Sequence, residues 1–183
     1  MSSSGLMVLT DADVISHFIV AGELAELPNI LKPHKIIILQ NVYNEIARIK
    51  SRKNYLDNIV NLLKTITIIP FPSQNIDIKK EYALIKKINP LIGDGERACM
   101  AVAKFQKDVI ASSNFRDIIP YCKANKILYL GTLDILAIAL QKKIFDITRC
   151  DNFISITRKI NKAKYPGHVN SIKDYTPGDI SFI

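Results

Sequence analysis

Residues 93–117, GDGERACMAVAKFQKDVIASSNFRD, constrain the fold of this chain more than any other stretch. Apolar side chains recur at helical spacing after Glu96, which predicts an amphipathic helix. Residues 108–111 then form a short apolar run with β-branched members, bounded by Ser112 and its polar neighbours, which predicts a buried strand. A helix that leads directly into a buried strand is typical of α/β sheets. Ligands of such sheets bind outside the carboxyl ends of the strands, so the polar residues after this strand mark a candidate site.

The same alternation of strand-like and helix-like segments runs along the rest of the chain. Four further apolar runs predict strands at residues 6–10, 35–39, 66–69 and 127–130. Helices are predicted around them, at residues 13–20, 41–50, 54–63, 78–88, 117–124, 132–142 and 150–160, with a second short helix ending before Pro28. The expected fold class is α/β, a three-layer α/β/α arrangement with a mainly parallel central sheet of about five strands.

The length of 183 residues suits one domain with a sizeable core. We expect residues 1–5 to be a disordered N-terminus and residues 6–163 to form the domain. Residues 164–183 are polar and irregular, and we expect a C-terminal extension that packs on the domain or on a partner through Tyr175 and Phe182.

Composition sets aside several other classes of protein. No run approaches the roughly 18 apolar residues of a membrane span, and no signal-peptide pattern opens the chain, so we expect a cytoplasmic protein with no membrane partner. Cys99, Cys122 and Cys150 are too widely spaced for a zinc pair or a disulfide framework, and we interpret them as buried free thiols.

Acidic residues gather at the predicted strand ends and helix starts. They are Asp11, Glu45, Glu96 and Asp117. Carboxylates on one rim repel one another unless a cation or bound protons neutralise them. Because no Cys or His set accompanies them, they favour a hard cation, Mg²⁺ or Mn²⁺, and a phosphate ester as substrate.

Each acid also has an ordinary structural interpretation. Asp11 could cap the following helix, although Asp13 could be the true cap and leave Asp11 free. Glu45 could form a helical ion pair with Arg48. Glu96 could simply be an acid favoured in the first turn by the helix dipole. Taken singly these interpretations are the simpler ones, but the shared edge of the sheet favours a common site.

The chain is basic, with a net charge of +8. A local group of cations surrounds the second and third helices: Lys32, Lys35, Arg48, Lys50, Arg52 and Lys53. An acidic metal site flanked by basic surface suits a phosphodiester, with metal on the scissile phosphate and cations on its neighbours. Net charge alone leaves nucleic acid and an acidic partner equally open.

Four segments together resemble the PIN-domain nucleases. VLTDADVI is similar to the opening strand of that family, NVYNEIARI to its second acidic segment, GDGERACMAVA to the helix with the third acid, and ASSNFRDI to the last active-site strand end. The matching residues are Asp11, Glu45, Glu96, Ser112, Asn114 and Asp117. The run YLGTLDILAIALQKKIFD also resembles an uncharacterised branch of the family, and the resemblance covers residues 6–160.

This resemblance implies a PIN-like fold and a metal-dependent endoribonuclease. The four acids would hold Mg²⁺ or Mn²⁺, and Ser112 and Asn114 would support them or position a phosphate. The last motif often carries aspartate where this chain has Asn114, which leaves Asp117 or Asp134 to supply a fourth carboxylate.

The implied partners are RNA and, because many family members are toxins of bacterial toxin–antitoxin pairs, an antitoxin; a homodimer is left open. Two other functions remain as alternatives. The first is a non-catalytic PIN-fold protein that binds RNA or acts as a scaffold, which the exchange at Asn114 favours. The second is a metal-dependent phosphatase, which Asp11-Ala12-Asp13 fits in part.

Overall fold

The apolar runs form a five-stranded sheet in the order β3-β2-β1-β4-β5, in which every neighbouring pair is parallel. The computed structural model describes residues 5–183, so most of the expected disordered N-terminus, residues 1–4, lies outside the described part. The strands are β1 Met7–Thr10, β2 Lys35–Leu39, β3 Ile66–Ile69, β4 Val109–Ala111 and β5 Tyr129–Leu130.

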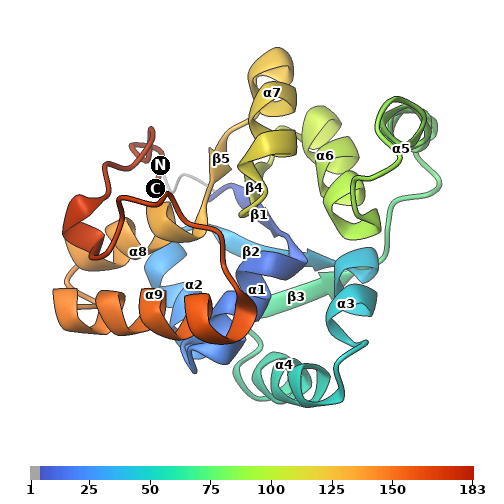
Figure 1. Cartoon of the computed structure of the whole chain (residues 1–183). Helices are drawn as coiled ribbons and strands as arrows, with labels where there is room; N and C mark the ends of the chain where they lie inside the picture. The colour runs from blue at the N-terminus through green and yellow to red at the C-terminus, as the bar shows by residue number, and fades with distance from the viewer. Residues whose placement is uncertain (1–4) are drawn as a thin grey trace.

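Helices cover both faces of this sheet (Figure 1). They are α1 Ala12–Val20, α2 Leu27–Leu31, α3 Gln40–Ile46, α4 Lys50–Leu63, α5 Ile76–Ile88, α6 Asp94–Gln106, α7 Phe115–Asn125, α8 Thr132–Gln141 and α9 Ile147–Asn161, with 3₁₀ turns η1 Leu24–Glu26 and η2 Ile172–Asp174. In Figure 1, α5, α6 and α7 lie above the sheet, and α1, α2 and α9 lie below it. The predicted α/β class with a parallel central sheet is therefore confirmed.

The core lies between the central strands and the helices on either side. Val8, Leu9 and Ile38 of β1 and β2 are almost fully buried, as expected for parallel strands that are covered on both faces. Ala98 and Ala101 of α6 are fully buried. Their small side chains let this helix lie close to the strands.

Within residues 5–183, no single helix is long and apolar enough to cross a membrane. Residues 12–20 and 24–31 are long and apolar enough only when they are counted together, and the chain bends by 120° between them. Both parts carry fully buried core residues, including Phe18 and Leu27.

Several boundaries differ from the sequence prediction. The helix expected to end before Pro28 is instead a 3₁₀ turn followed by α2, whose first turn contains Pro28. Proline is tolerated there because a first-turn N–H has no helical acceptor. The strand expected at residues 127–130 is paired only at Tyr129–Leu130, since its neighbour β4 is itself three residues long.

The C-terminal segment lies against the domain. The hydroxyl of Tyr175 donates to Oδ1 of Asp134 over 2.8 Å, and the backbone N–H of Gly178 donates to the same oxygen over 3.0 Å. Near the chain end, Nε2 of His34 lies 2.8 Å from the carbonyl oxygen of Phe182. Because Nδ1 of His34 accepts from the backbone N–H of Leu6, just before β1, Nε2 carries the proton and donates to that carbonyl.

Candidate active site

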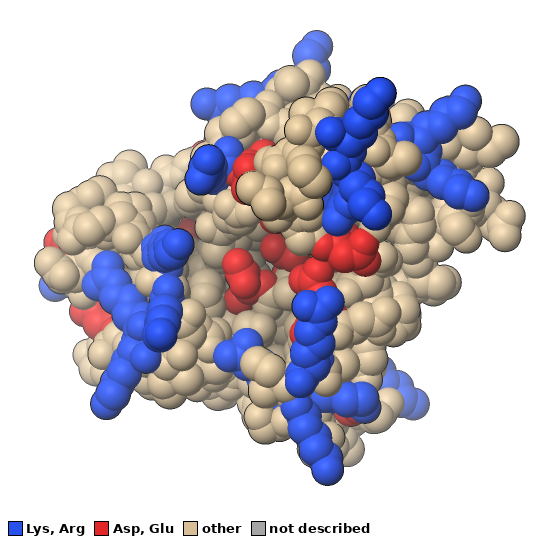
Figure 2. Space-filling view, turned by 45° about the vertical axis from the view of Figure 1, so that its right-hand side comes forward, with Lys and Arg blue, Asp and Glu red and all other residues tan. Residues whose placement is uncertain are grey.

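The carboxyl ends of β1 and β4 meet at the centre of the sheet. The backbone N–H of Asp11 donates to the carbonyl of Ala111 over 2.8 Å, which fixes the two strand ends together. The helix after β1 leaves toward one face of the sheet and the helix after β4 toward the other, which makes this point the topological switch where α/β proteins bind ligands. Figure 2 shows acidic side chains gathered in a central depression, with basic side chains on both sides of it.

Asp11 is buried at the start of α1. Its Oδ1 accepts from the N–H of Ala12 over 2.7 Å, and its Oδ2 accepts from the hydroxyl of Ser112 over 3.3 Å. Burial raises the pKa of Asp11 well above its ordinary value, and the charges of Glu96 and Asp13 raise it further. The alternative in which Asp13 caps the helix is wrong, because Asp11 is the cap and Asp13 is exposed in the first turn.

Glu96 lies in the first turn of α6, almost fully buried. Its Oε2 accepts from the side-chain amide of Asn114 over 3.0 Å, whereas its Oε1 is buried without any hydrogen-bond partner. Burial raises the pKa of Glu96 to about 7, with the charges of Asp117, Asp13 and Glu45 adding to the effect and Asn114 opposing it. A buried carboxylate oxygen with no donor is a free ligand position.

Asn114 joins two acids of the rim. The same Nδ2 that bonds Glu96 also donates to Oδ2 of Asp117 over 2.8 Å, and Oδ1 of Asp117 accepts from Asn89 over 3.2 Å. The amide thus supplies a hydrogen-bond donor between two carboxylates, at the position where the last motif of the PIN-domain nucleases often has aspartate. The backbone N–H of Asn114 in turn donates to the hydroxyl of Ser112 over 3.1 Å, which links this turn to Asp11.

Asp134, the other candidate for a fourth carboxylate, has a different role. Its Oδ2 accepts from the N–H of Gly131 over 2.7 Å at the start of α8, and its Oδ1 holds the C-terminal segment. Both oxygens are therefore occupied by structural hydrogen bonds. Asp117 is the acid that joins the rim.

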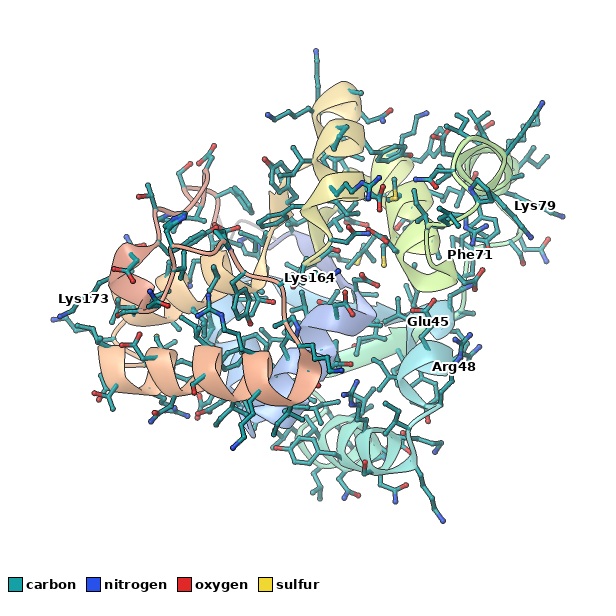
Figure 3. All side chains as sticks on the ribbon, viewed as in Figure 1. Glu45, Arg48, Phe71, Lys79, Lys164 and Lys173 are labelled. Atoms are coloured by element: carbon teal, nitrogen blue, oxygen red, sulfur yellow. The ribbon has the colours of Figure 1, made fainter. Side chains whose placement is uncertain are left out.

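Glu45 reaches the rim from α3. Its Oε1 accepts from the N–H of Gly95 over 2.8 Å, at the start of α6. A Cβ at Gly95 would lie 2.8 Å from Cγ2 and 3.0 Å from Cα of Val42, so only glycine lets the two helices approach so closely. The ion pair with Arg48 that the spacing allowed is not among the salt bridges of residues 5–183, and Figure 3 shows Arg48 on the outer side of α3.

The donors at this rim suit a hard cation. They are carboxylate oxygens with the hydroxyl of Ser112 beside them, and oxygen atoms are the ligands that Mg²⁺ and Mn²⁺ take in proteins; the amide of Asn114 turns its nitrogen to the acids as a hydrogen-bond donor. Within residues 5–183, no three His, Cys, Asp or Glu side chains converge on a ready-made metal position. The four acids expected to share a cation thus form no closed three-ligand cage in this part of the chain, and a cation held here would use one or two of them and keep its waters, as Mg²⁺ usually does.

The cations predicted to surround the second and third helices do not form a single group in the structure. Arg52 donates to Oδ1 of Asn161 over 2.7 Å at the end of α9, and its charge helps to lower the pKa of the buried His17 beside the site. Lys53 is paired instead with Asp57 over 2.6 Å, on α4 itself. Arg52 and Lys53 are neighbours in the sequence but thus make contacts with different elements, α9 and α4.

A hollow of about 300 Å³ adjoins the acidic rim, and its lining was not predicted from the sequence. We call it the side hollow; besides Asp13 and Ala163, its lining residues are His17, Ser113, Asn114, Asn161, Lys162 and Lys164. The last three come from the end of α9 and the start of the C-terminal segment. No motif marks them, because their position depends on the chain returning to β1 and β4 from a distant part of the sequence.

Comparison with known proteins is informative at the level of the fold. No family model matches the chain, and no curated protein matches it. Among solved structures, the chain is similar to one chain of VapBC2 from Rickettsia felis, solved bound to a DNA fragment from their promoter, with a TM-score of 0.51 and 12% identity over 69% of this chain and 98% of that one. The fold is PIN-like. At this identity the likeness extends to the fold and not to the chemistry.

Proposed function

We propose that this protein is a metal-dependent endoribonuclease that hydrolyses RNA phosphodiesters with Mg²⁺ or Mn²⁺. The observation that carries the proposal is the pair formed by Asp11 and Glu96. These two buried acids come from opposite sides of the β1–β4 junction, their pKa values are both raised, and Glu96 keeps one oxygen without a partner. Perturbed acids that converge at a topological switch point favour a functional site over a purely structural one.

Asp11 and Glu96 would hold the cation, with Glu45 and Asp117 adding negative charge around it. A bound divalent ion lowers the pKa of a water ligand and neutralises charge on a phosphate. The chain's own residues set up the site: Ser112 orients Asp11, Asn114 orients Glu96 and Asp117, and Gly95 fixes Glu45. Residues that fix the direction of metal ligands in this way strongly affect metal affinity.

RNA is the proposed substrate because basic side chains flank the acidic depression (Figure 2). Cations on both sides of a metal site can neutralise the phosphates next to the scissile one. An antitoxin is the proposed protein partner, in keeping with the similarity to VapBC2, and self-association into a homodimer is the other assembly we propose to test.

A non-catalytic scaffold is the second candidate function, and one specific observation favours it. The amide of Asn114 bonds both Glu96 and Asp117, so hydrogen bonding relieves part of their repulsion without a cation.

The phosphatase alternative needs Asp11 as a covalent nucleophile. Asp11 caps α1, and hydrogen bonds from Ala12 and Ser112 fix its carboxylate, which suits a fixed metal ligand better than a nucleophile that must approach phosphorus.

Cleavage assays separate these functions. We expect the wild type to cut single-stranded RNA internally with Mn²⁺ or Mg²⁺, to stop in chelator, and to leave a small phosphate monoester intact. Asp11→Asn keeps the cap and the size of the side chain but removes a charge, so it should abolish most of the cleavage. Asp77→Asn, an exposed first-turn acid of α5, is the matched control and should cut like the wild type. Equal rates for Asp11→Asn and wild type would refute the proposal.

A further inference from the structure

We infer that the side hollow binds the nucleotide next to the scissile phosphate of a single-stranded RNA, with Lys162 and Lys164 neutralising its phosphate. The inference rests on the proposed function for the identity of the ligand. It assigns a binding role to the junction between α9 and the C-terminal segment, which no sequence motif marks.

The position and lining of the side hollow fit a nucleotide. The hollow shares Asn114 with the acidic rim, so a chain lying across the acids would continue directly into it. Its volume of about 300 Å³ is at the lower end of the range for small-molecule sites. Its lining is largely polar and consists of hydroxyl, amide, imidazole and lysine side chains together with one carboxylate, that of Asp13.

The two lysines reach this space because of how α9 ends. Lys162 adopts a left-handed conformation with φ 52°, which turns the chain back toward the sheet after Asn161. The next residues are anchored, since the N–H of Ala163 donates to the carbonyl of Thr157 over 3.2 Å and the hydroxyl of Tyr165 lies 2.9 Å from Oγ1 of the same threonine. Lys164 therefore projects from a fixed backbone, and Figure 3 shows it beside α1, between α9 and α7.

Charge complementarity favours a phosphate at these lysines. Both are exposed, and within residues 5–183 neither forms a salt bridge. An acidic rim on one side and two unpaired ammonium groups on the other match a metal-bound phosphate followed by a second phosphate. Neutralising phosphates with lysine is the main source of affinity for nucleic acid, and it makes binding depend on salt.

His17 gives the hollow a means of recognising a ribose. Its Nδ1 lies 3.0 Å from Oγ1 of Thr132, which lies 2.7 Å from the hydroxyl of Ser113. Burial lowers the pKa of His17, with Asp13 opposing the effect and Arg52 adding to it. An imidazole and neighbouring hydroxyls can exchange hydrogen bonds with a 2′-hydroxyl, the group by which proteins distinguish RNA from DNA.

The test is RNA binding by the full chain, measured by fluorescence anisotropy with a labelled single-stranded RNA of mixed sequence in chelator. The variant combines Lys162→Gly, which suits a positive φ, with Lys164→Ala. We expect affinity to fall about tenfold, and the slope of log K against log salt to become shallower by about 0.7, because one phosphate loses the lysines that neutralise it. Lys173→Ala removes an exposed lysine of the same segment, distant from Lys164 in Figure 3, and should bind like the wild type.

A double variant that binds like the wild type, or a Lys173→Ala control that loses as much, would overturn the inference. Cleavage distinguishes the two proposals. If the wild type cuts RNA and the double variant has the same KM, the hollow is not a subsite and the nuclease proposal stands. If the wild type binds through these lysines but does not cut, the nuclease proposal fails and the binding site stands.

His17→Gln provides an independent readout. The ratio of RNA to DNA affinity for one sequence should fall toward one, and this ratio is unaffected by the amount of folded protein. An unchanged ratio would remove His17 from the subsite.

Discussion

Replacing Glu96 by glutamine tests how much the burial of this carboxylate, together with the charges of the neighbouring acids, destabilises the metal-free protein. Glutamine keeps the size of the side chain, and its carbonyl can accept from Asn114 as Oε2 does now. The variant loses a buried negative charge whose pKa the protein raises from 4.5 to about 7. We therefore expect the metal-free variant to be more stable than the wild type.

The size of the effect follows from linkage. In the unfolded chain Glu96 ionises near pH 4.5, whereas in the folded protein it keeps its proton up to about pH 7. The folded state thus binds more protons between these values, so the stability of the wild type falls as pH rises through this window. The ionised group costs about 3 kcal/mol at pH 8 and less than about 1 kcal/mol at pH 5.

Urea unfolding in chelator at both pH values measures this difference. Glu96→Gln should exceed the wild type by up to about 3 kcal/mol at pH 8, and the gain should shrink to less than about 1 kcal/mol at pH 5. Asp77→Asn removes an exposed acid from the first turn of α5, and it should lose only a few tenths of a kcal/mol because it weakens a helix-dipole interaction. A Glu96→Gln variant that is less stable than the wild type at pH 8, or whose effect does not change with pH, would refute the reasoning.

Two further predictions concern the frame around the site. Gly95→Ala places a methyl group against the backbone of Val42, so it should destabilise the protein by about 1–3 kcal/mol and lower metal affinity by displacing Glu45. Urea unfolding measures the stability and Mn²⁺ titration the affinity. A variant as stable as the wild type would contradict this prediction. Lys107 ends α6 with φ 57°, so Lys107→Gly should stabilise the protein by about 0.5–1 kcal/mol in thermal melts, whereas Lys107→Ala, which keeps the strained φ, should not.

Much of the fold could be predicted from local sequence. Residues 35–39 and 66–69 form strands at the predicted positions, because β-branched residues such as isoleucine favour strands; the first of these is buried, whereas the second is an edge strand in which only Ile66 is buried. Parallel topology followed from the alternation of strands and helices. The errors lie where a local rule was applied too strictly, as at Pro28, where a helix start was taken for a helix stop.

The contacts that define the site were less accessible from the sequence. The positions of Asp11 and Glu96, and of Ser112 and Asn114 that bond them, could be predicted from local motifs, whereas contacts with distant segments could not. The exclusion of Asp134 from the rim is the clearest case, since its partners Tyr175 and Gly178 follow it by 41 and 44 residues. Lys164 likewise reaches the side hollow only because the chain turns back after α9. Such long-range returns leave no periodic pattern in the sequence.

The central claim is that Asp11 and Glu96 hold a divalent cation. Anomalous diffraction from crystals soaked in Mn²⁺ tests it most directly. We predict a manganese peak at the β1–β4 junction with the carboxylates of Asp11 and Glu96 among its oxygen ligands, and loss of this peak in Glu96→Gln crystals soaked in the same way. Manganese bound elsewhere, or no peak at the junction in millimolar Mn²⁺, would contradict the claim.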